Sequence, residues 1–367
     1  MDRQRKIYVE YGGDIERMTL DLLEAYGVAD RIPAGASVAL KPNLVVAKPA
    51  QSGATTHPEI LRGVLRYLRA HGVRDVSIIE GSWVGDDTKR AFDRAGYRPV
   101  AAEFGVPLFD LKDDETKTVK TAIGEMRICA RALDAGFLIN LPVLKGHCQT
   151  GMTCALKNCK GCLPDSEKRR FHSMGLHRPI GALAAYLKPA VTLVDSICGD
   201  PGFEEGGNPV QTDRLFLGDD PVQLDAYGCR LLGMRPEDVP YIGYAERFGA
   251  GRAAWTEDDI VALTPAPQKK AVRTDSRALL KNVREDSACS ACCAALTAAL
   301  VELDGQGTPY TGPLAIGQGN RGLDPGCPGI GNCCRAASAF AKGCPPTQQA
   351  IAAFLRELRQ KTDPPSV

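Results

Sequence analysis

Short apolar runs separated by helical segments constrain the fold of this chain more than any other feature. The runs are rich in Val, Ile or Leu and have the length of single strands; they lie at 38–40, 76–79, 137–141, 191–194 and 215–217. Helical patterns lie between them at 58–69 and 88–95, and another follows the last run at 222–232. Short buried strands that alternate with helices are typical of a parallel sheet. The sequence therefore predicts an α/β fold, with mostly parallel sheet(s) flanked by helices.

The 367 residues are enough for two domains. The α/β pattern extends over 1–265, and two lobes dividing near residue 125 are one form that it could take. A proline-containing stretch at 264–275 is typical of a linker, and a helix, a cysteine-rich loop and a helix follow over 275–360. The polar stretch 158–178 is expected to be an insertion or an active-site loop.

Overall composition points away from several classes of protein. The net charge of +1 gives no reason to expect binding to nucleic acid or to an anionic membrane. The first residues lack the apolar segment of a signal peptide, and no apolar stretch is long enough to span a bilayer. We therefore expect a cytoplasmic protein. Fourteen cysteines are many for a chain in a reducing compartment, where clustered thiols indicate metal or redox chemistry.

The C-terminal cysteines have the spacing of a metal site. Cys289 and Cys292 have two residues between them, so both sulfurs could reach one centre, and two distant cysteines could complete four thiolate ligands. Cys344 is followed by proline, as in ferredoxin motifs. Spacing alone leaves three candidates for the third ligand, Cys327, Cys333 and Cys334. A [4Fe-4S] cluster is favoured over zinc and over plain buried thiols.

A second dense group of chemical side chains begins just after the predicted strand 137–141. Lys145, His147, Lys157 and Asn158 are the residue types that would bind an anionic or oxygen-rich substrate, and His172 follows downstream. We expect His147, Lys145 and His172 to be catalytic, with His147 or His172 as proton donor.

Polar residues also follow other predicted strands. Lys41 and Asn43 come after the strand 38–40, and Glu80 and Ser82 after the strand 76–79. Because ligands bind at the carboxyl ends of strands in open α/β sheets, these residues are expected to form a substrate site with Lys157 and Asn158. Each of them alone could be turn chemistry instead.

Four further cysteines lie in or beside the segment that starts at Lys145: Cys148, Cys154, Cys159 and Cys162. They could hold a second cluster, and ligation by three thiolates would leave one iron open for substrate. Alternatively, they are small apolar side chains packed under a loop.

Several of these motifs, in this order, resemble the family catalogued as domain of unknown function 362. The resemblance runs from about residue 37 to 235, and its motifs are at 41–43, 145–158, 206–209 and 219–226. Some members resemble this chain further, in a C-terminal Cys-x-x-Cys, Gly-Asn-Cys and Cys-Pro-Pro. That likeness implies an iron–sulfur protein with Cys289, Cys292, Cys333 and Cys344 as ligands. It implies nothing secure for the cysteines at 148–162.

The expected function is that of an anaerobic iron–sulfur oxidoreductase or reductive lyase, with electrons relayed from the C-terminal cluster to a cleft in the α/β domain. A small-molecule substrate and an electron donor such as a ferredoxin are the expected partners; a homodimer stays open. The alternatives are a non-catalytic electron-transfer protein or metallochaperone, and a zinc hydrolase or lyase. The residues alone leave open whether the chain is an enzyme.

Overall fold

The computed structural model describes residues 5–267 and 279–362, which form two compact units, residues 1–273 and 274–367. Most of the predicted linker 264–275 lies outside the described residues. Strands from before and after residue 125 belong to one sheet of the first unit. The predicted α/β class is confirmed.

An eight-stranded sheet forms the first unit, in the order β12-β1-β11-β10-β7-β2-β3-β4. Its strands are β1 (Ile7–Tyr11), β2 (Val38–Pro42), β3 (Val76–Glu80), β4 (Leu108–Asp110), β7 (Phe137–Leu141), β10 (Val191–Ser196), β11 (Arg214–Gly218) and β12 (Ile260–Ala262). Each of the five predicted strands is present. Only β11 runs antiparallel to its neighbours in this sheet, β10 and β1. The carboxyl ends of β2, β3, β7 and β10 therefore lie at one edge.

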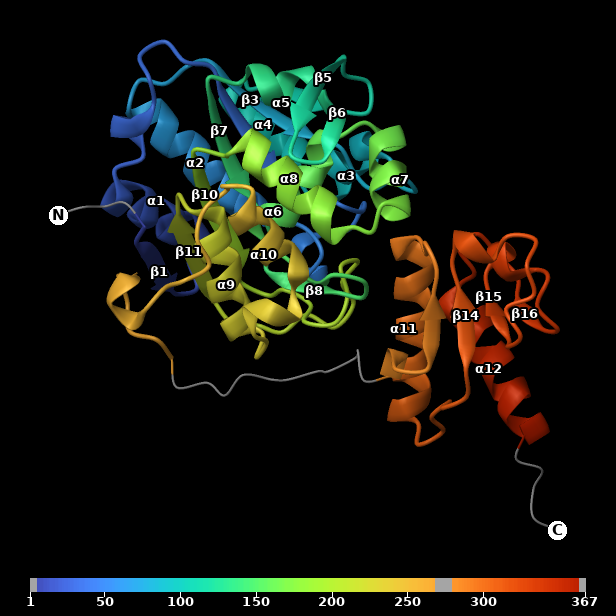
Figure 1. Cartoon of the computed structure of the whole chain (residues 1–367). Helices are drawn as coiled ribbons and strands as arrows, with labels where there is room; N and C mark the ends of the chain where they lie inside the picture. Colours follow the sequence, from blue (N-terminus) through green and yellow to red (C-terminus); the bar gives the residue numbers. More distant parts are fainter. Residues whose placement is uncertain (1–4, 268–278, 363–367) are drawn as a thin grey trace. The chain divides into compact units, whose positions relative to one another are not determined.

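Helices cover both faces of this sheet (Figure 1). One face packs against α1 (Ile15–Tyr26), α2 (Pro58–Ala70), α3 (Thr88–Arg94) and α4 (Tyr97–Phe104). The other face packs against α5 (Ala130–Asp134), α6 (Ala155–Asn158), α7 (Asp165–Ser173), α8 (His177–Leu187), α9 (Pro221–Leu231) and α10 (Pro240–Arg247). Side chains alternate across β2, where Leu40 joins the first core and Ala39 the second. The result is a three-layer sandwich.

Smaller elements complete the first unit. They are the hairpins β5 (Thr116–Thr121) with β6 (Gly124–Cys129) and β8 (Lys145–His147) with β9 (Gly151–Thr153), and the 3-10 helices η1 (Ala29–Arg31), η2 (Ala50–Ser52), η3 (Cys159–Cys162), η4 (Pro236–Asp238) and η5 (Glu257–Asp259). Of the two expectations for 158–178, the active-site loop was wrong for most of that stretch, which contains η3 and α7, and the insertion stays a prediction. Helix α7 was not predicted because its sequence is mostly polar. Its buried residues include Phe171 and Lys168.

The second unit contains a small parallel sheet and two longer helices. Its strands are β13 (Val283–Glu285), β14 (Leu314–Ile316), β15 (Gly329–Ile330) and β16 (Phe340–Ala341), with α11 (Ser290–Gly305) and α12 (Gln348–Thr362). Two 3-10 turns, η7 (Gln318–Asn320) and η8 (Asn332–Cys334), lie in its loops. The two helices pack together, and Arg356 pairs with Glu302 at 2.6 Å. None of the described helices in either unit has the length and apolarity needed to cross a bilayer.

Close packing of α1 on α2 depends on Gly63. A Cβ atom at this position would lie 2.7 Å from Thr19 Cβ and 3.1 Å from the carbonyl oxygen of Glu16. Gly243 in α10 is a matched control, because it is exposed and a Cβ there would meet no atom within 4 Å.

We expect Gly63→Ala to lower the free energy of unfolding by about 1–3 kcal/mol, because overpacking forces the two helices apart. Gly243→Ala should raise it by up to about 1 kcal/mol, since alanine favours the helix. Urea denaturation followed by circular dichroism measures both. Equal effects of the two substitutions would contradict this account of the α1–α2 contact.

Candidate functional site

A buried ion pair joins the carboxyl ends of β2 and β3. Lys41 Nζ lies 2.6 Å from Glu80 Oε2, and the two side chains are 1% and 3% exposed. Glu80 also accepts hydrogen bonds from the backbone N–H groups of Leu44 and Gly81. Gly161 of η3 rests on this pair, because a Cβ there would lie 2.6 Å from both Lys41 Nζ and Glu80 Oε1. The pair therefore positions the loops around it.

Asn158, at the end of α6, ties the neighbouring strands together. Its side-chain amide donates to Asn140 Oδ1 at 2.7 Å and to the carbonyl oxygen of Lys41 at 3.2 Å.

Ser82 is held by hydrogen bonds of its own. Its Oγ atom lies 3.1 Å from Thr88 Oγ1, and its carbonyl oxygen accepts from Lys168 Nζ at 2.7 Å. All of these polar groups are buried.

Lys145 is fully buried and satisfied by three acceptors. Its ammonium donates to Asn43 Oδ1 at 3.2 Å, to the carbonyl oxygen of Glu204 at 2.7 Å and to that of Ala54. Burial lowers the pKa of Lys145 to about 7, although Glu204 acts in the opposite direction. Because an ammonium has three donors, this arrangement fits a charged lysine that fixes the loop carrying Glu204.

Glu204 places its carboxylate beside two side chains that the sequence singled out, Lys157 and His147. Its Oε2 atom lies 3.0 Å from Lys157 Nζ and 2.9 Å from His147 Nε2, which is not aligned for a hydrogen bond to it. His147 Nδ1 accepts from the N–H groups of Gln149 and Thr150, which assigns the ring proton to Nε2. Burial acts to raise the pKa of Glu204, but His147 and Lys157 hold it well below its ordinary value.

His172 and Lys160 form the outer part of this cluster. Lys160 Nζ lies 3.0 Å from His172 Nε2, and His172 Nδ1 is buried without a partner. Burial first, and then the charge of Lys160, lowers the pKa of His172 to about 3. Burial also lowers the pKa of Lys160 to about 7. His172 is therefore neutral at pH 7, and Lys160 has the better matched pKa for a proton donor.

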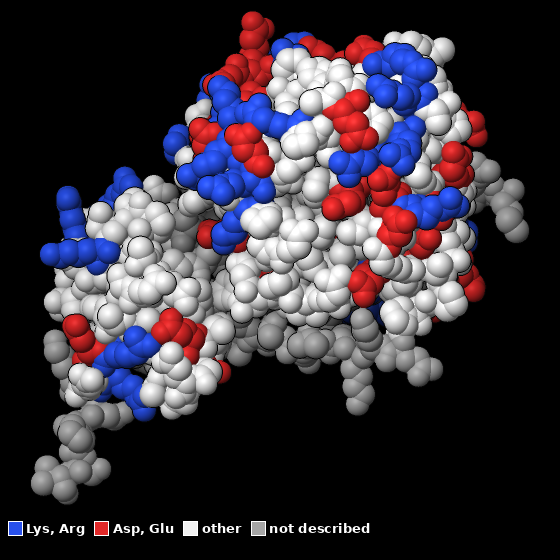
Figure 2. Space-filling view, turned by 180° about the vertical axis from the view of Figure 1, so that it is seen from behind, with Lys and Arg blue, Asp and Glu red and all other residues white. Residues whose placement is uncertain are grey.

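Hydrogen bonds and ion pairs thus connect most of the predicted residues of the first unit, and their catalytic and binding roles stay predictions. Sequence reasoning missed Glu204, Lys160 and Lys168. Lys160 lies inside the motif that drew attention, but nothing local marks Glu204 as the partner of His147 and Lys157. On the face of the first unit drawn in Figure 2, basic and acidic side chains are interspersed.

The four cysteines proposed for a second cluster have different surroundings. Cys154 lies beside Asp225 and Cys229, whereas Cys159 and Cys162 interact with each other and with Lys41. Burial raises the pKa of each of these three buried thiols. Cys148 interacts with Glu205. Their ligand role stays a prediction.

In the second unit, the four cysteines predicted as ligands come near one another. The pKa of Cys292 is raised first by a hydrogen bond with Cys289, then by burial and by the charges of Cys289, Cys344 and Cys333. Cys292 Sγ lies 3.4 Å from where a Cβ of Gly331 would be.

The two loops that carry Cys333 and Cys344 are tied to each other. The N–H of Asn332 donates to the carbonyl oxygen of Gly343 at 2.8 Å, and Asn332 Oδ1 accepts from the N–H of Gly343 at 2.9 Å. Within residues 5–267 and 279–362, however, no group of three or more His, Cys, Asp or Glu side chains has the arrangement of a metal site. The four thiols are neighbours without that spacing, and their ligand role stays a prediction.

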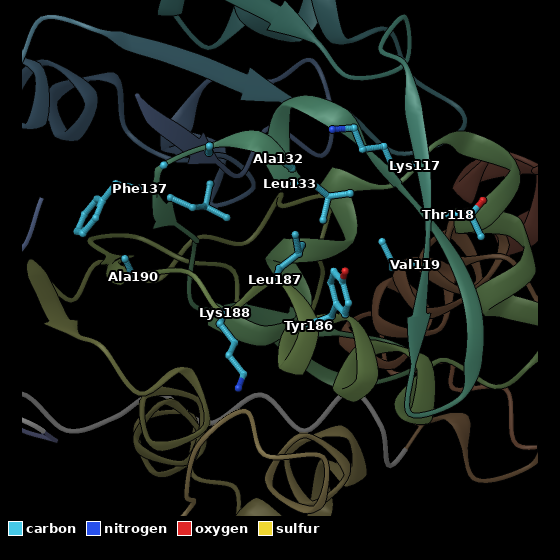
Figure 3. A pocket seen from close by; sticks show the side chains of 13 residues that line it. Lys117, Thr118, Val119, Ala132, Leu133, Phe137, Tyr186, Leu187, Lys188 and Ala190 are labelled. Carbon is cyan, nitrogen blue, oxygen red and sulfur yellow. The ribbon is translucent and has the colours of Figure 1, made fainter. Parts of the chain in front are cut away.

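A cavity of about 430 Å³ lies elsewhere in the first unit. Side chains of β5, α5 and the end of α8 line it, among them Leu133, Tyr186 and Leu187 (Figure 3). Phe137, at the start of β7, also lines it, which places the cavity at the amino ends of strands. It contains none of the predicted site residues.

Comparison with known proteins gives three findings. The family described as "Domain of unknown function (DUF362)" matches residues 38–230. The thylakoid-associated protein sll1697 of Synechocystis sp. is 25% identical over 235 residues, which are 62% of this chain and 73% of that protein. The lactate racemase apoprotein of Thermoanaerobacterium thermosaccharolyticum is similar at 14% identity and a TM-score of 0.43, over 63% of this chain and 58% of that chain. The family match includes the first unit's polar cluster and excludes Cys289, Cys292, Cys333 and Cys344.

The pKa of His172 predicts a loss of stability in acid. The unfolded chain binds a proton at His172 near pH 6.5, whereas the folded chain binds it only near pH 3. As the pH falls between these values, the unfolded state takes up the proton first, so the free energy of unfolding falls, by up to about 1.4 kcal/mol per pH unit. His172→Gln should remove this slope. Urea denaturation at a series of pH values measures it, with His71→Gln, an exposed imidazole, as the control.

Proposed function

The chain belongs to the DUF362 family, and for this member we propose an iron–sulfur-dependent redox enzyme that acts on a small anionic or oxygen-rich substrate. The observation that carries the proposal is that four thiols from three separate segments approach one another. Cys289 and Cys292 come from the first segment, Cys333 from the second and Cys344 from the third. A thiolate set of this kind is typical of a [4Fe-4S] cluster.

The surroundings of the four thiols fit such a cluster. Gly331 and Gly343 have positive φ angles of 85° and 140° beside Cys333 and Cys344, so backbone comes close where side chains could not. Arg321 makes a hydrogen bond to Cys333, and this bond raises the pKa of Arg321. The charges of Cys344 and Cys289 raise the pKa of Arg321 further. A guanidinium here would offset part of the negative charge of four thiolates. When bound, the cluster would supply electrons one at a time.

The first unit offers what a substrate of this class needs. Lys157 brings an ammonium close to one carboxylate, that of Glu204. His147 brings a ring N–H close to the same carboxylate. A substrate carboxylate or other oxyanion would find the same partners. Lys160, with a pKa of about 7, could hold or release a proton at Nζ beside the neutral His172. Lys145 would keep the loop bearing Glu204 in position.

Anaerobic purification of the full chain tests the cluster. We expect a brown protein with about four irons and four sulfides per chain. Cys289→Ala and Cys333→Ala should each lose most of the iron, because each removes a ligand. Cys327→Ala and Cys334→Ala are matched controls and should keep it. A colourless protein that contains zinc would instead favour a zinc hydrolase or lyase, and iron loss in Cys334→Ala with retention in Cys333→Ala would reassign the ligand.

Thermal shift with a panel of small carboxylates and oxyanions tests the substrate site. We expect at least one anion to raise the melting temperature of the wild-type chain, and Lys157→Met to reduce that shift at least threefold, because a buried cation is lost. Lys89→Met is the matched control, since Lys89 is exposed and pairs with Asp113 on the surface. Iron without any anion binding would favour the alternative of an electron-transfer protein or metallochaperone.

A further inference from the structure

A second group of reactive side chains lies beside the polar cluster and is not used by the proposed function. It consists of Cys198, just after β10, Asp195, within β10, and His57, just before α2. Their exposed fractions are 5%, 1% and 4%. His57 Nδ1 lies 2.8 Å from Asp195 Oδ2, and His57 Nε2 lies 3.6 Å from Cys198 Sγ.

The orientation of the imidazole is fixed from two sides. The backbone N–H of His57 donates to the same Asp195 Oδ2 atom at 2.8 Å, and Asp195 Oδ1 accepts from the N–H of Ile197 at 3.0 Å. With Nδ1 held by the carboxylate, Nε2 is the ring atom that faces the sulfur. A thiol, an imidazole and a carboxylate in this sequence of contacts are the arrangement that activates a cysteine nucleophile.

Charge acts in the same direction as geometry. Burial acts to lower the pKa of His57, but Asp195 first, and then Cys198, outweigh it and raise the pKa to about 11. The ring is therefore an imidazolium at neutral pH and carries a proton on Nε2. Tyr97 also lies near Asp195, and it donates to the carbonyl oxygen of Thr56. A positive charge beside a sulfur stabilises the thiolate, which is the reactive form of cysteine.

We propose that Cys198 is an oxidation-sensitive thiol, modified to a sulfenic acid by small hydroperoxides. The Cys198 thiolate attacks one peroxide oxygen, so that an S–O bond forms and the O–O bond breaks. The sulfur loses two electrons, and the peroxide is reduced. The second oxygen leaves as hydroxide and takes a proton from His57 or water. Because Cys198 is only 5% exposed, hydrogen peroxide fits this site better than bulkier reagents.

Other cysteines of the first unit show why the reaction would be selective. Burial raises the pKa of Cys129 to about 12 and that of Cys162 to about 11. Thiols of this kind stay protonated and inert. Cys198 Sγ also lies 3.5 Å from the carbonyl oxygen of Ala50, which accepts a hydrogen bond from the thiol.

The test follows sulfenic acid in the full-length chain. The protein is exposed to limiting hydrogen peroxide with a chelator present, the reaction is stopped with catalase, and the chain is unfolded in dimedone. Peptide mass spectrometry then gives the labelling rate at each cysteine. We expect Cys198 to be labelled at least about tenfold faster than Cys129.

Variants test whether the His57 imidazolium, and not the exposure of the thiol, sets the labelling rate of Cys198. His57→Gln and Asp195→Asn should each slow the labelling of Cys198 about tenfold and leave that of Cys129 unchanged. His71→Gln is the matched control, because His71 also pairs with a carboxylate, Glu24 at 2.9 Å, but faces no thiol. Equal labelling of Cys198 and Cys129 in the wild-type chain would overturn the proposal even if both variants failed to fold. Unchanged labelling of Cys198 in a folded His57→Gln variant would overturn it as well.

Discussion

The carboxylate of Glu204 is the counter-charge on which the interior of the first unit depends. Burying an ammonium without a partner is costly, and Lys157 pairs with this carboxylate, which His147 also approaches. The carbonyl oxygen of the same residue also accepts from Lys145. The loop between β10 and β11 is therefore a structural requirement of the cluster as well as its acidic component. A change in that loop would alter the charge state of residues on several other elements.

The sequence predicted much of the framework because its signals are local. Each apolar run became a strand, and the rule that binding residues follow strands brought Lys41, Glu80 and Asn158 into one network. Glu204 could not be found in this way. It lies 47 positions from Lys157, in a glycine-rich loop without periodicity, so only the folded chain reveals the pair. Helix α7 was missed because few of its residues are apolar, and its buried surface includes the charged Lys168.

The fourteen cysteines fall into groups with different surroundings. In the first unit, Cys129, Cys154 and Cys162 are buried, with pKa values raised by desolvation, which suits packing. Cys198 differs because a charged imidazole faces it. In the second unit, Cys292 interacts with three other thiols. A cysteine count therefore says little about function until the neighbours of each sulfur are known.

Strand β12 pairs with β1, and Lys6 near one end of the first unit's chain contacts Asp259 near the other. Tyr11 and Thr264 exchange two further hydrogen bonds, at 2.7 and 3.0 Å. The beginning and end of this unit are thus neighbours at one edge of the sheet. A domain of this design tolerates circular permutation, and it can gain or lose an appended module in evolution without a change in its core. The family match covers residues 38–230 and includes neither β1 nor β12.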